Sequence, residues 1–215
     1  MEKRKAGRPS RDTNARELLI KHARDLFTVM SYDKVSIRLV AQKAGVNSAL
    51  IRYYFGNKEG LFETMVRDTL APMEQQVKRL MQDSSNGSVF DIMRTYYREM
   101  IKFPQFPRLI AQVMQMPASE IQRTLIERVF MDITKPVQSV LFDKLFGEER
   151  MKEGMDAKLC KVSYLSLMVF PFIAPHSLFA IHGIELNEEF LNQLLEHNIK
   201  MMTSGMLKAD NTVEN

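Results

Sequence analysis

The stretch SIRLVAQKAGVNSALIRYYFGNK, residues 36–58, decides the fold. Ser36 is a favourable N-cap for a short helix that runs through Ala44. Gly45 follows at the position where a helix commonly ends in the left-handed conformation. A second short helix comes directly after this turn. Two short helices joined by a glycine-containing turn are typical of a helix-turn-helix.

The second helix of this pair, from Asn47 to about Phe55, has an inner and an outer face. Helical spacing places on the inner face Val46, Leu50, Ile51, Tyr54 and Phe55. It leaves outward Asn47, Ser48, Ala49, Arg52 and Tyr53. Small or polar residues at the helix start permit close approach to bases, and the Arg52 guanidinium can donate a fork of hydrogen bonds to guanine. The pattern predicts DNA recognition; the alternative is two short helices that only pack a small core.

Lys58 lies in the first turn of the next helix, for which Asn57 is the expected cap. A helix dipole disfavours a positive side chain at this end. A DNA phosphate at the same place would accept backbone N–H bonds and pair with the ammonium. We therefore expect Lys58 to contact a phosphate; the alternative is an exposed lysine tolerated at small cost.

The net charge of +4 conceals an asymmetry along the chain. Residues 1–60 hold 13 Lys and Arg against 6 Asp and Glu, whereas residues 61–215 hold 17 against 20. A basic end on a mildly acidic body indicates a module that binds a polyanion. Within the tail KRKAGRP, Arg4 and Arg8 are candidates for a slim arm in the DNA minor groove. The alternative is a basic leader without a fixed register.

The segment ARDLF at residues 23–27, together with residues 36–62, resembles the N-terminal domain of the TetR family of bacterial transcriptional regulators. The resemblance implies an all-helical dimer, with a helix-turn-helix in each subunit and a ligand-sensing C-terminal domain. Carried over by position, the DNA-contacting candidates are Ser36, Ile37, Asn47, Ser48, Ala49, Arg52, Tyr53, Tyr54 and Lys58. This chain departs from the family at Arg52, where many members have a tyrosine.

The rest of the chain shows helical periodicity and no alternating run that would predict a strand. Helices are expected over residues 11–30, 36–44, 47–55, 58–83, 89–103, 108–116, 119–146, 157–181 and 187–207. Prolines should interrupt the fourth of these at Pro72, kink the seventh at Pro136, and disturb the eighth at Pro171 and Pro175. We therefore predict an all-α protein: a three-helix DNA-binding domain over residues 1–60 and a larger helical domain over 61–215 for effector binding and dimerisation.

Methionine and aromatic side chains are frequent in the second domain. They suit an apolar pocket that reshapes around a ligand, and they suit an ordinary helical core equally well. The candidate ligand-binding residues are Tyr96, Phe103, Met114, Phe130, Met168, Phe172 and His176. The effector implied by such a lining is small and largely apolar.

The last two helices are the dimer surface that the resemblance implies. Apolar residues that one subunit's core might leave unused are Leu159, Val162, Leu165, Val169, Leu191, Leu195, Met202 and Met206. Packing inside a single subunit is the alternative for each of them. A symmetric dimer would place its two recognition helices on a palindromic operator.

No sequence feature supports catalysis, a metal or a cofactor. There is no nucleophile elbow, no phosphate-cradling glycine loop and no paired histidine spacing. Cys160, the single cysteine, is expected to be a buried structural thiol. No stretch of 18 charge-free apolar residues occurs and the first residues lead into polar sequence, so a cytoplasmic protein without a membrane segment is expected.

The sequence thus predicts a homodimeric, ligand-responsive transcriptional regulator, most often a repressor, that binds double-stranded DNA. One alternative is a DNA-binding architectural or partner-recruiting protein with no small-molecule effector. Another is a helical enzyme or small-molecule binder whose basic N-terminus is incidental.

Overall fold

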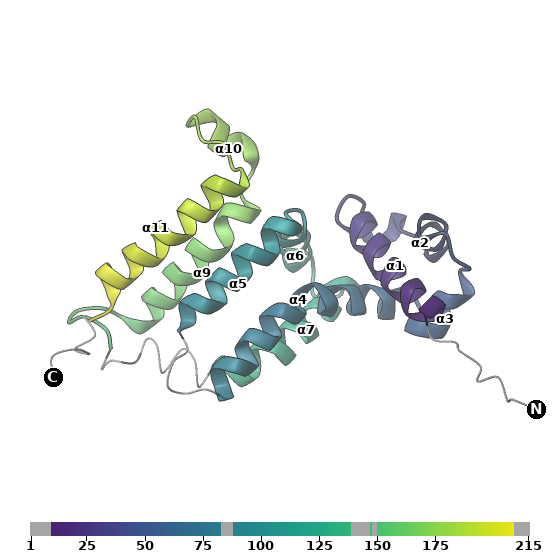
Figure 1. Ribbon diagram of the computed structural model, residues 1–215, viewed down its shortest axis with the longest axis horizontal. Helices are drawn as coiled ribbons and strands as arrows, with labels where there is room; N and C mark the ends of the chain where they lie inside the picture. Colours follow the sequence, from purple (N-terminus) through teal and green to yellow (C-terminus); the bar gives the residue numbers. More distant parts are fainter. Residues whose placement is uncertain (1–9, 83–87, 139–146, 148–149, 209–215) are drawn as a thin grey trace, which may run out of the picture. The chain divides into compact units, whose positions relative to one another are not determined.

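A computed structural model describes residues 10–82, 88–138, 147 and 150–208, and Figure 1 shows that the regular elements in these ranges are helices. They are α1 (Ser10–Phe27), α2 (Ile37–Ala44), α3 (Ala49–Phe55), α4 (Lys58–Gln82), α5 (Val89–Lys102), α6 (Phe106–Met114), α7 (Ile121–Gln138), α9 (Ala157–Ile173), α10 (His176–Ile181) and α11 (Glu188–Met206), with a 3-10 turn, η1, at Tyr32–Lys34. Extended pairing in these ranges is limited to an isolated antiparallel bridge between Met151 and Leu207. The all-α prediction is confirmed.

The helices form two compact units. The first takes in residues up to Thr69 together with Gln112–Val129, and the second takes in Leu70–Ala111 and the chain from Phe130 onward. The predicted domain boundary at residue 60 falls in the first turn of α4, whose residues are shared between the two units. No helix in the described ranges is both long and apolar enough to cross a bilayer.

One prediction about prolines was wrong and one was confirmed. The helix α4 is not interrupted at Pro72, because a proline removes only its own N–H bond and the flanking turns continue. Similarly α9 continues through Pro171. The disturbance predicted at Pro175 is confirmed, because the segment over residues 157–181 forms two helices, α9 and α10. They separate at Ala174, which is extended because it precedes Pro175.

Other helix ends also differ from prediction. The first helix ends at Phe27 rather than at residue 30, and α6 covers Phe106–Met114 rather than residues 108–116. The seventh helix begins at Ile121, later than expected, and its predicted continuation over residues 139–146 lies outside the described residues.

The second unit is built on α5, α9 and α11, which pack side by side (Figure 1). Pro171 has no N–H, so the Leu167 carbonyl one turn earlier lacks its usual helical partner. The Tyr97 hydroxyl donates to this carbonyl at 2.9 Å, and the Asn198 amide donates to it at 3.4 Å and to the Tyr97 oxygen at 3.3 Å. Burial raises the pKa of Tyr97 to about 12, although the Asn198 hydrogen bond opposes this rise, so the phenol remains a donor. The Leu167 carbonyl, which Pro171 leaves without a helical partner, therefore joins the three helices through side-chain hydrogen bonds.

A second polar contact closes the end of α9. The Arg108 guanidinium donates to the carbonyl oxygens of Phe172 and Ala174, at 3.2 Å each. Carbonyls in the last turn of a helix lack intrahelical partners, and a cation there also complements the helix dipole. Arg108 thus stabilises the place where α9 stops.

We expect Tyr97→Phe to lower the free energy of unfolding by about 1 kcal/mol, because it removes a donor from a buried carbonyl. In a Pro171→Ala background the restored N–H can satisfy Leu167, so the same Tyr97→Phe change should cost less. Urea denaturation of the four variants measures this coupling. Tyr53→Phe, on a side chain that is 78% exposed, is the control. Equal costs in both backgrounds would contradict the explanation.

Candidate nucleic-acid interface

The helix-turn-helix forms with the Ser36 cap and the Gly45 turn that its sequence predicts. The Ser36 hydroxyl accepts a hydrogen bond from the Leu39 N–H at 3.1 Å, and Gly45 ends α2 at φ 66°, in the left-handed region. The Asn47 side-chain oxygen accepts from the Ala49 N–H at 2.8 Å at the start of α3, whose N-cap residue is Ser48 and has no side-chain cap bond. Ile51 and Phe55 are buried. Both short helices pack against α1 (Figure 1), so the unpacked side of α3 is free to face a partner.

That unpacked side of α3 carries the predicted recognition residues. The exposed ones are Asn47, Ala49, Arg52 and Tyr53, and the partly exposed ones are Ser48 and Tyr54. The Tyr53 and Tyr54 rings meet edge to face with centroids 4.9 Å apart. Amide, guanidinium and phenol groups on one outward face match the donors that proteins use toward bases and phosphates.

The remaining predicted DNA contacts lie beside α3 or outside the described residues. Ser36 is exposed, with its hydroxyl engaged in the N-cap, and Ile37 is partly exposed at the start of α2. Lys58 is partly exposed at the start of α4. Arg4 and Arg8 belong to residues 1–9, which are not among the described residues, so the minor-groove arm stays a prediction.

The start of α4 lies very close to the end of α3. The Asn57 side-chain oxygen caps α4 by accepting from the Gly60 N–H at 2.8 Å, as the sequence predicts. A Cβ atom on Gly60 would overlap the Phe55 carbonyl oxygen. Glycine at position 60 therefore allows the last turn of the recognition helix to rest directly on α4.

Lys58 has a neighbour that sequence reasoning did not identify. Its ammonium nitrogen lies 4.1 Å from the centroid of the Tyr32 ring, within the range of a cation–π interaction. The Tyr32 ring stacks on Phe27 at 5.5 Å and meets Phe62 edge-on at 5.2 Å. Burial lowers the pKa of Lys58, while the nearby carboxylates of Asp33 and Glu59 act in the opposite direction. Tyr32 lies in a turn, where helical periodicity gives no signal.

A hydrogen-bonded ion pair between α1 and α4 was also not predicted from the sequence. The Arg24 guanidinium donates to the Thr69 hydroxyl at 2.8 Å and pairs with the Asp68 carboxylate at 2.7 Å. The Thr69 hydroxyl in turn donates to the Met65 carbonyl one turn earlier. These contacts join the helix that supports the helix-turn-helix to the part of α4 that belongs to the same unit.

The structure brings together part of the predicted ligand-binding set. The Phe172 ring meets the rings of Tyr96 and Tyr97 edge-on, at 5.5 and 5.0 Å, and Met168 is buried one turn before it. Burial, together with the neighbouring Tyr97, raises the pKa of Tyr96. These side chains form an aromatic core in the second unit.

The other predicted ligand residues are not buried. Phe103 and Phe130 are partly exposed, and His176 is exposed at the first position of α10. Met114 is 37% exposed and falls in the first unit rather than the second. The ligand-binding role of the whole set stays a prediction.

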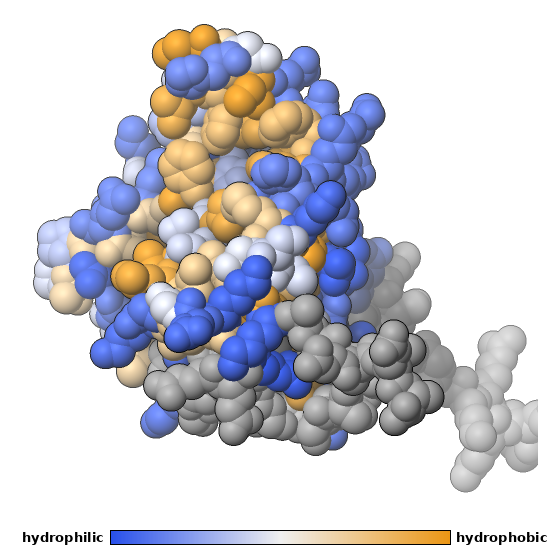
Figure 2. All heavy atoms as spheres, turned by 90° about the vertical axis from the view of Figure 1, so that its left-hand side faces the viewer, coloured by the Kyte–Doolittle hydropathy of each residue, from blue (hydrophilic) through white to orange (hydrophobic). Residues whose placement is uncertain are grey.

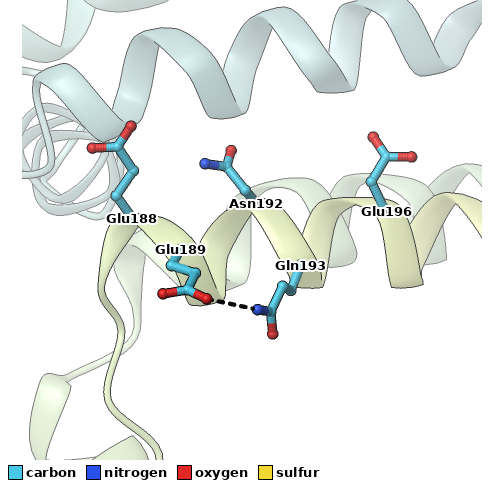
Figure 3. Close-up of a pocket in the computed structure, with 5 residues that line it drawn as sticks. All are labelled: Glu188, Glu189, Asn192, Gln193 and Glu196. Carbon is cyan, nitrogen blue, oxygen red and sulfur yellow. Dashed lines mark hydrogen bonds between the residues drawn. The ribbon is translucent and has the colours of Figure 1, made fainter.

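A surface pocket occurs elsewhere, along α11. It is lined by Glu188, Glu189, Asn192, Gln193 and Glu196. In Figure 3, Glu188, Asn192 and Glu196 project from one side of the helix, while Gln193 donates to Glu189 on the other side at 3.3 Å. The lining is polar and acidic and shares no residue with the predicted ligand set. Such a face suits neither a DNA phosphate nor an apolar effector.

The described residues contain no cluster of His, Cys, Asp and Glu that could hold a metal ion. Cys160 is buried, as predicted, and burial, followed by the carboxylate of Asp156, raises the pKa of its thiol. A raised thiol pKa reduces the thiolate fraction and hence the reactivity of this cysteine.

Comparisons with known proteins agree with this geometry. Residues 19–65 match the family described as "Bacterial regulatory proteins, tetR family". The chain is 21% identical over 199 residues to the probable HTH-type transcriptional regulator YttP of Bacillus subtilis, covering 91% of this chain and 95% of that protein. It is 46% identical over 46 residues to BetI of Vibrio vulnificus, covering 21% of this chain and 23% of BetI.

Two solved structures show the same fold over most of both chains. The ketosteroid transcriptional regulator KstR2 of Mycobacterium tuberculosis superimposes with a TM-score of 0.65 at 16% identity, covering 96% of this chain and all of KstR2. The SmeT–triclosan complex superimposes with a TM-score of 0.63 at 15% identity, covering 94% and 95%.

The fold, the exposed face of α3 and these relatives make the chain similar to helix-turn-helix transcriptional regulators. The N-terminal part of the chain, residues 19–65, is therefore similar to the TetR family of bacterial transcriptional regulators.

We expect Gly60→Ala to lower the free energy of unfolding by about 1–3 kcal/mol, because the added methyl group must displace the Phe55 carbonyl. The same displacement should move the end of α3 and weaken DNA binding. Circular dichroism melts and gel shifts measure the two effects. Gly205→Ala is the matched control, because a Cβ there meets nothing within 4 Å. If both substitutions behave alike, the close approach at Gly60 is not a constraint.

Proposed function

We propose that this protein is a ligand-responsive repressor that binds a palindromic operator as a homodimer and is released by a small, largely apolar effector. The observation that carries the proposal is the outward face of α3, where Asn47, Ala49, Arg52 and Tyr53 are exposed beside the helix-turn-helix turn. The charge distribution supports the same reading, since residues 1–60 hold 13 cationic against 6 anionic side chains.

In the proposed complex, the start of α3 enters the major groove. Ser48 and Ala49 are small enough to let the helix approach the base edges, and Asn47 offers an amide beside them. The Arg52 guanidinium donates two hydrogen bonds to guanine O6 and N7. Tyr53 and Lys58 bind flanking phosphates, Lys58 together with the N–H groups at the start of α4. Base contacts then give specificity, and phosphate contacts give register and affinity.

Arg52→Ala and Lys58→Ala should separate these two kinds of contact. We expect loss of Arg52 to relax discrimination against mismatched operators by about 1–3 kcal/mol. Loss of Lys58 should weaken all sequences alike and reduce the slope of log affinity against log salt by about 1. Fluorescence anisotropy on DNA flanking the protein's own gene, over a salt series, measures both.

Lys200→Ala is the matched control for these titrations, because it removes the same charge from an exposed site on α11, in the other unit. If the control weakens binding as much as Lys58→Ala, the effect is bulk charge rather than a phosphate contact. If neither Arg52→Ala nor Lys58→Ala alters binding, α3 is not the recognition helix.

The proposed homodimer rests on an apolar face of α9. Leu159, Val162 and Leu165 are 69%, 61% and 46% exposed, although they are large and apolar. Figure 2 shows apolar side chains gathered between polar ones on the face of the molecule that lies to the left in Figure 1. Exposed apolar patches bounded by polar residues mark interaction surfaces, and a second copy offers the same patch in return.

The helix α11 contributes fewer exposed apolar residues to this proposed interface than the sequence pattern suggested. Leu191, Leu195 and Met202 are buried within their own unit, so their apolar surface is already used. Val169 on α9 and Met206 on α11 are partly exposed. We therefore assign the centre of the proposed interface to α9.

Val162→Asp should dissociate the dimer at micromolar concentration, because two copies of a buried carboxylate would face each other without partners. Operator affinity should fall with it, since a monomer binds a single half-site. Sedimentation velocity measures the mass, and Ser119→Asp, on an exposed turn before α7, is the control. A dimer that survives both Val162→Asp and Leu159→Asp would exclude this face.

The effector part of the proposal rests on the aromatic core around Tyr96, Met168 and Phe172. Soft and flat side chains of this kind can repack around an apolar ligand. SmeT, which shares the fold, has been solved with triclosan. For release to follow, the effector must bind the DNA-incompetent state more tightly than the competent one. We propose that this state differs in the tilt of α4, which carries residues of both units and contains Pro72 as a flexing point.

A further inference from the structure

We propose that Tyr32 is a positioning residue for DNA binding: its ring holds the Lys58 side chain at the start of α4, ready to meet a phosphate. The inference deepens the proposed function and rests on it, since it assumes that Lys58 contacts DNA. It assigns a role to a residue in the η1 turn, outside both helices of the helix-turn-helix.

The contact between the two side chains is close and the ring is fixed. The Lys58 nitrogen lies 4.1 Å from the Tyr32 centroid. Phe27 stacks on Tyr32 with an interplanar angle of 19°, and Phe62 meets it at 83°. Phe27 and Phe62 are 2% and 0% exposed and contact each other at 4.9 Å. The Tyr32 ring is therefore held by the core and cannot turn away from the ammonium.

The contacts of Tyr32 with its neighbours are made by the aromatic ring and not by the hydroxyl. Its hydroxyl oxygen is buried and has no hydrogen-bond partner among the described residues. Burial, followed by the carboxylates of Glu59 and Asp33, raises the pKa of Tyr32 to about 12, so the group stays a neutral phenol. A hydroxyl that is buried without a partner destabilises the fold, whereas the π face of the ring attracts a cation.

Holding Lys58 matters because its position is otherwise unfavourable. The dipole of α4 repels a cation at this end, and partial burial removes part of the ammonium's hydration. Lys58 forms no salt bridge among the described residues, although Asp33 and Glu59 are near enough to influence it. The Tyr32 ring compensates for part of this cost, and it orders a flexible side chain before DNA arrives, which reduces the entropy lost on binding.

The geometry can be tested in the protein without DNA. The ring current of Tyr32 should shift the Lys58 ε-methylene proton resonances upfield, with assignment by their loss in Lys58→Gln. Tyr32→Phe should keep this shift, because the ring remains, and should raise the melting temperature. Tyr32→Leu should abolish the shift. Unshifted Lys58 resonances in the native protein would overturn the inference, whatever the protein does with DNA.

The consequence for binding is tested by a double-mutant cycle between Tyr32→Leu and Lys58→Gln, read by operator affinity of the full chain. Tyr32→Leu should weaken binding about two- to five-fold, as expected for a partly exposed cation–π contact, and should add nothing once Lys58 is glutamine. Tyr32→Phe should bind nearly as the native protein does. Equal losses from Tyr32→Leu in both backgrounds would show that Tyr32 acts through the fold alone, and the proposal would fail.

The cycle also distinguishes a failure of the proposed Lys58 phosphate contact from a failure of the role proposed for Tyr32. If Lys58→Gln alone leaves operator affinity unchanged, the proposed phosphate contact of Lys58 fails, and the role of Tyr32 in DNA binding fails with it. Should Tyr32→Leu fold poorly, Tyr32→Phe and Tyr32→Met keep the test decisive, because the first retains an aromatic ring and the second an apolar side chain without one.

Discussion

The packing of Phe27, Tyr32 and Phe62 is the interaction on which the first unit depends. These three rings belong to the end of α1, the η1 turn and the start of α4. Because α4 begins directly after α3, fixing its first turn also fixes the end of the recognition helix, and the absence of a side chain at Gly60 lets the two meet. The buried side chains of Ile51 and Phe55 also hold α3 in place, so its outward face is positioned by residues that do not themselves point toward a partner.

The sequence predicted the parts of this arrangement that local rules determine. The Ser36 cap and the Gly45 turn each depend on residues within a few positions of one another, and both formed as expected. The Asn47 side chain accepts a hydrogen bond from the first N–H of α3, although the N-cap position is Ser48. The Tyr32–Lys58 contact was not predicted, because tertiary packing brings together residues that lie in different elements. The Arg24–Asp68 pair spans 44 positions and was missed for the same reason.

The prolines of the second unit show why local rules were not sufficient there. Pro171 and Pro175 look alike in sequence, yet α9 continues through the first and stops before the second. Pro171 is tolerated because the Leu167 carbonyl that it leaves unpaired receives hydrogen bonds from Tyr97 and Asn198, on two other helices. No spacing rule reveals those donors. The same applies to the apolar residues of α9 and α11, since periodicity alone does not tell a core face from an interface.

Under the proposed function, the contrast between Arg52 and Lys58 indicates how a base contact and a phosphate contact differ in their structural requirements. Arg52 is exposed on α3, whereas the Lys58 ammonium rests on an aromatic ring. A phosphate is found at the same place in every sequence, so a side chain that binds it gains from being ordered in advance. A base-reading guanidinium must instead adjust to the edge that it meets, and a wrong base then leaves its donors unpaired. Under the proposed function, order at Lys58 would raise affinity for any DNA, and only Arg52 and its neighbours on α3 would distinguish the operator.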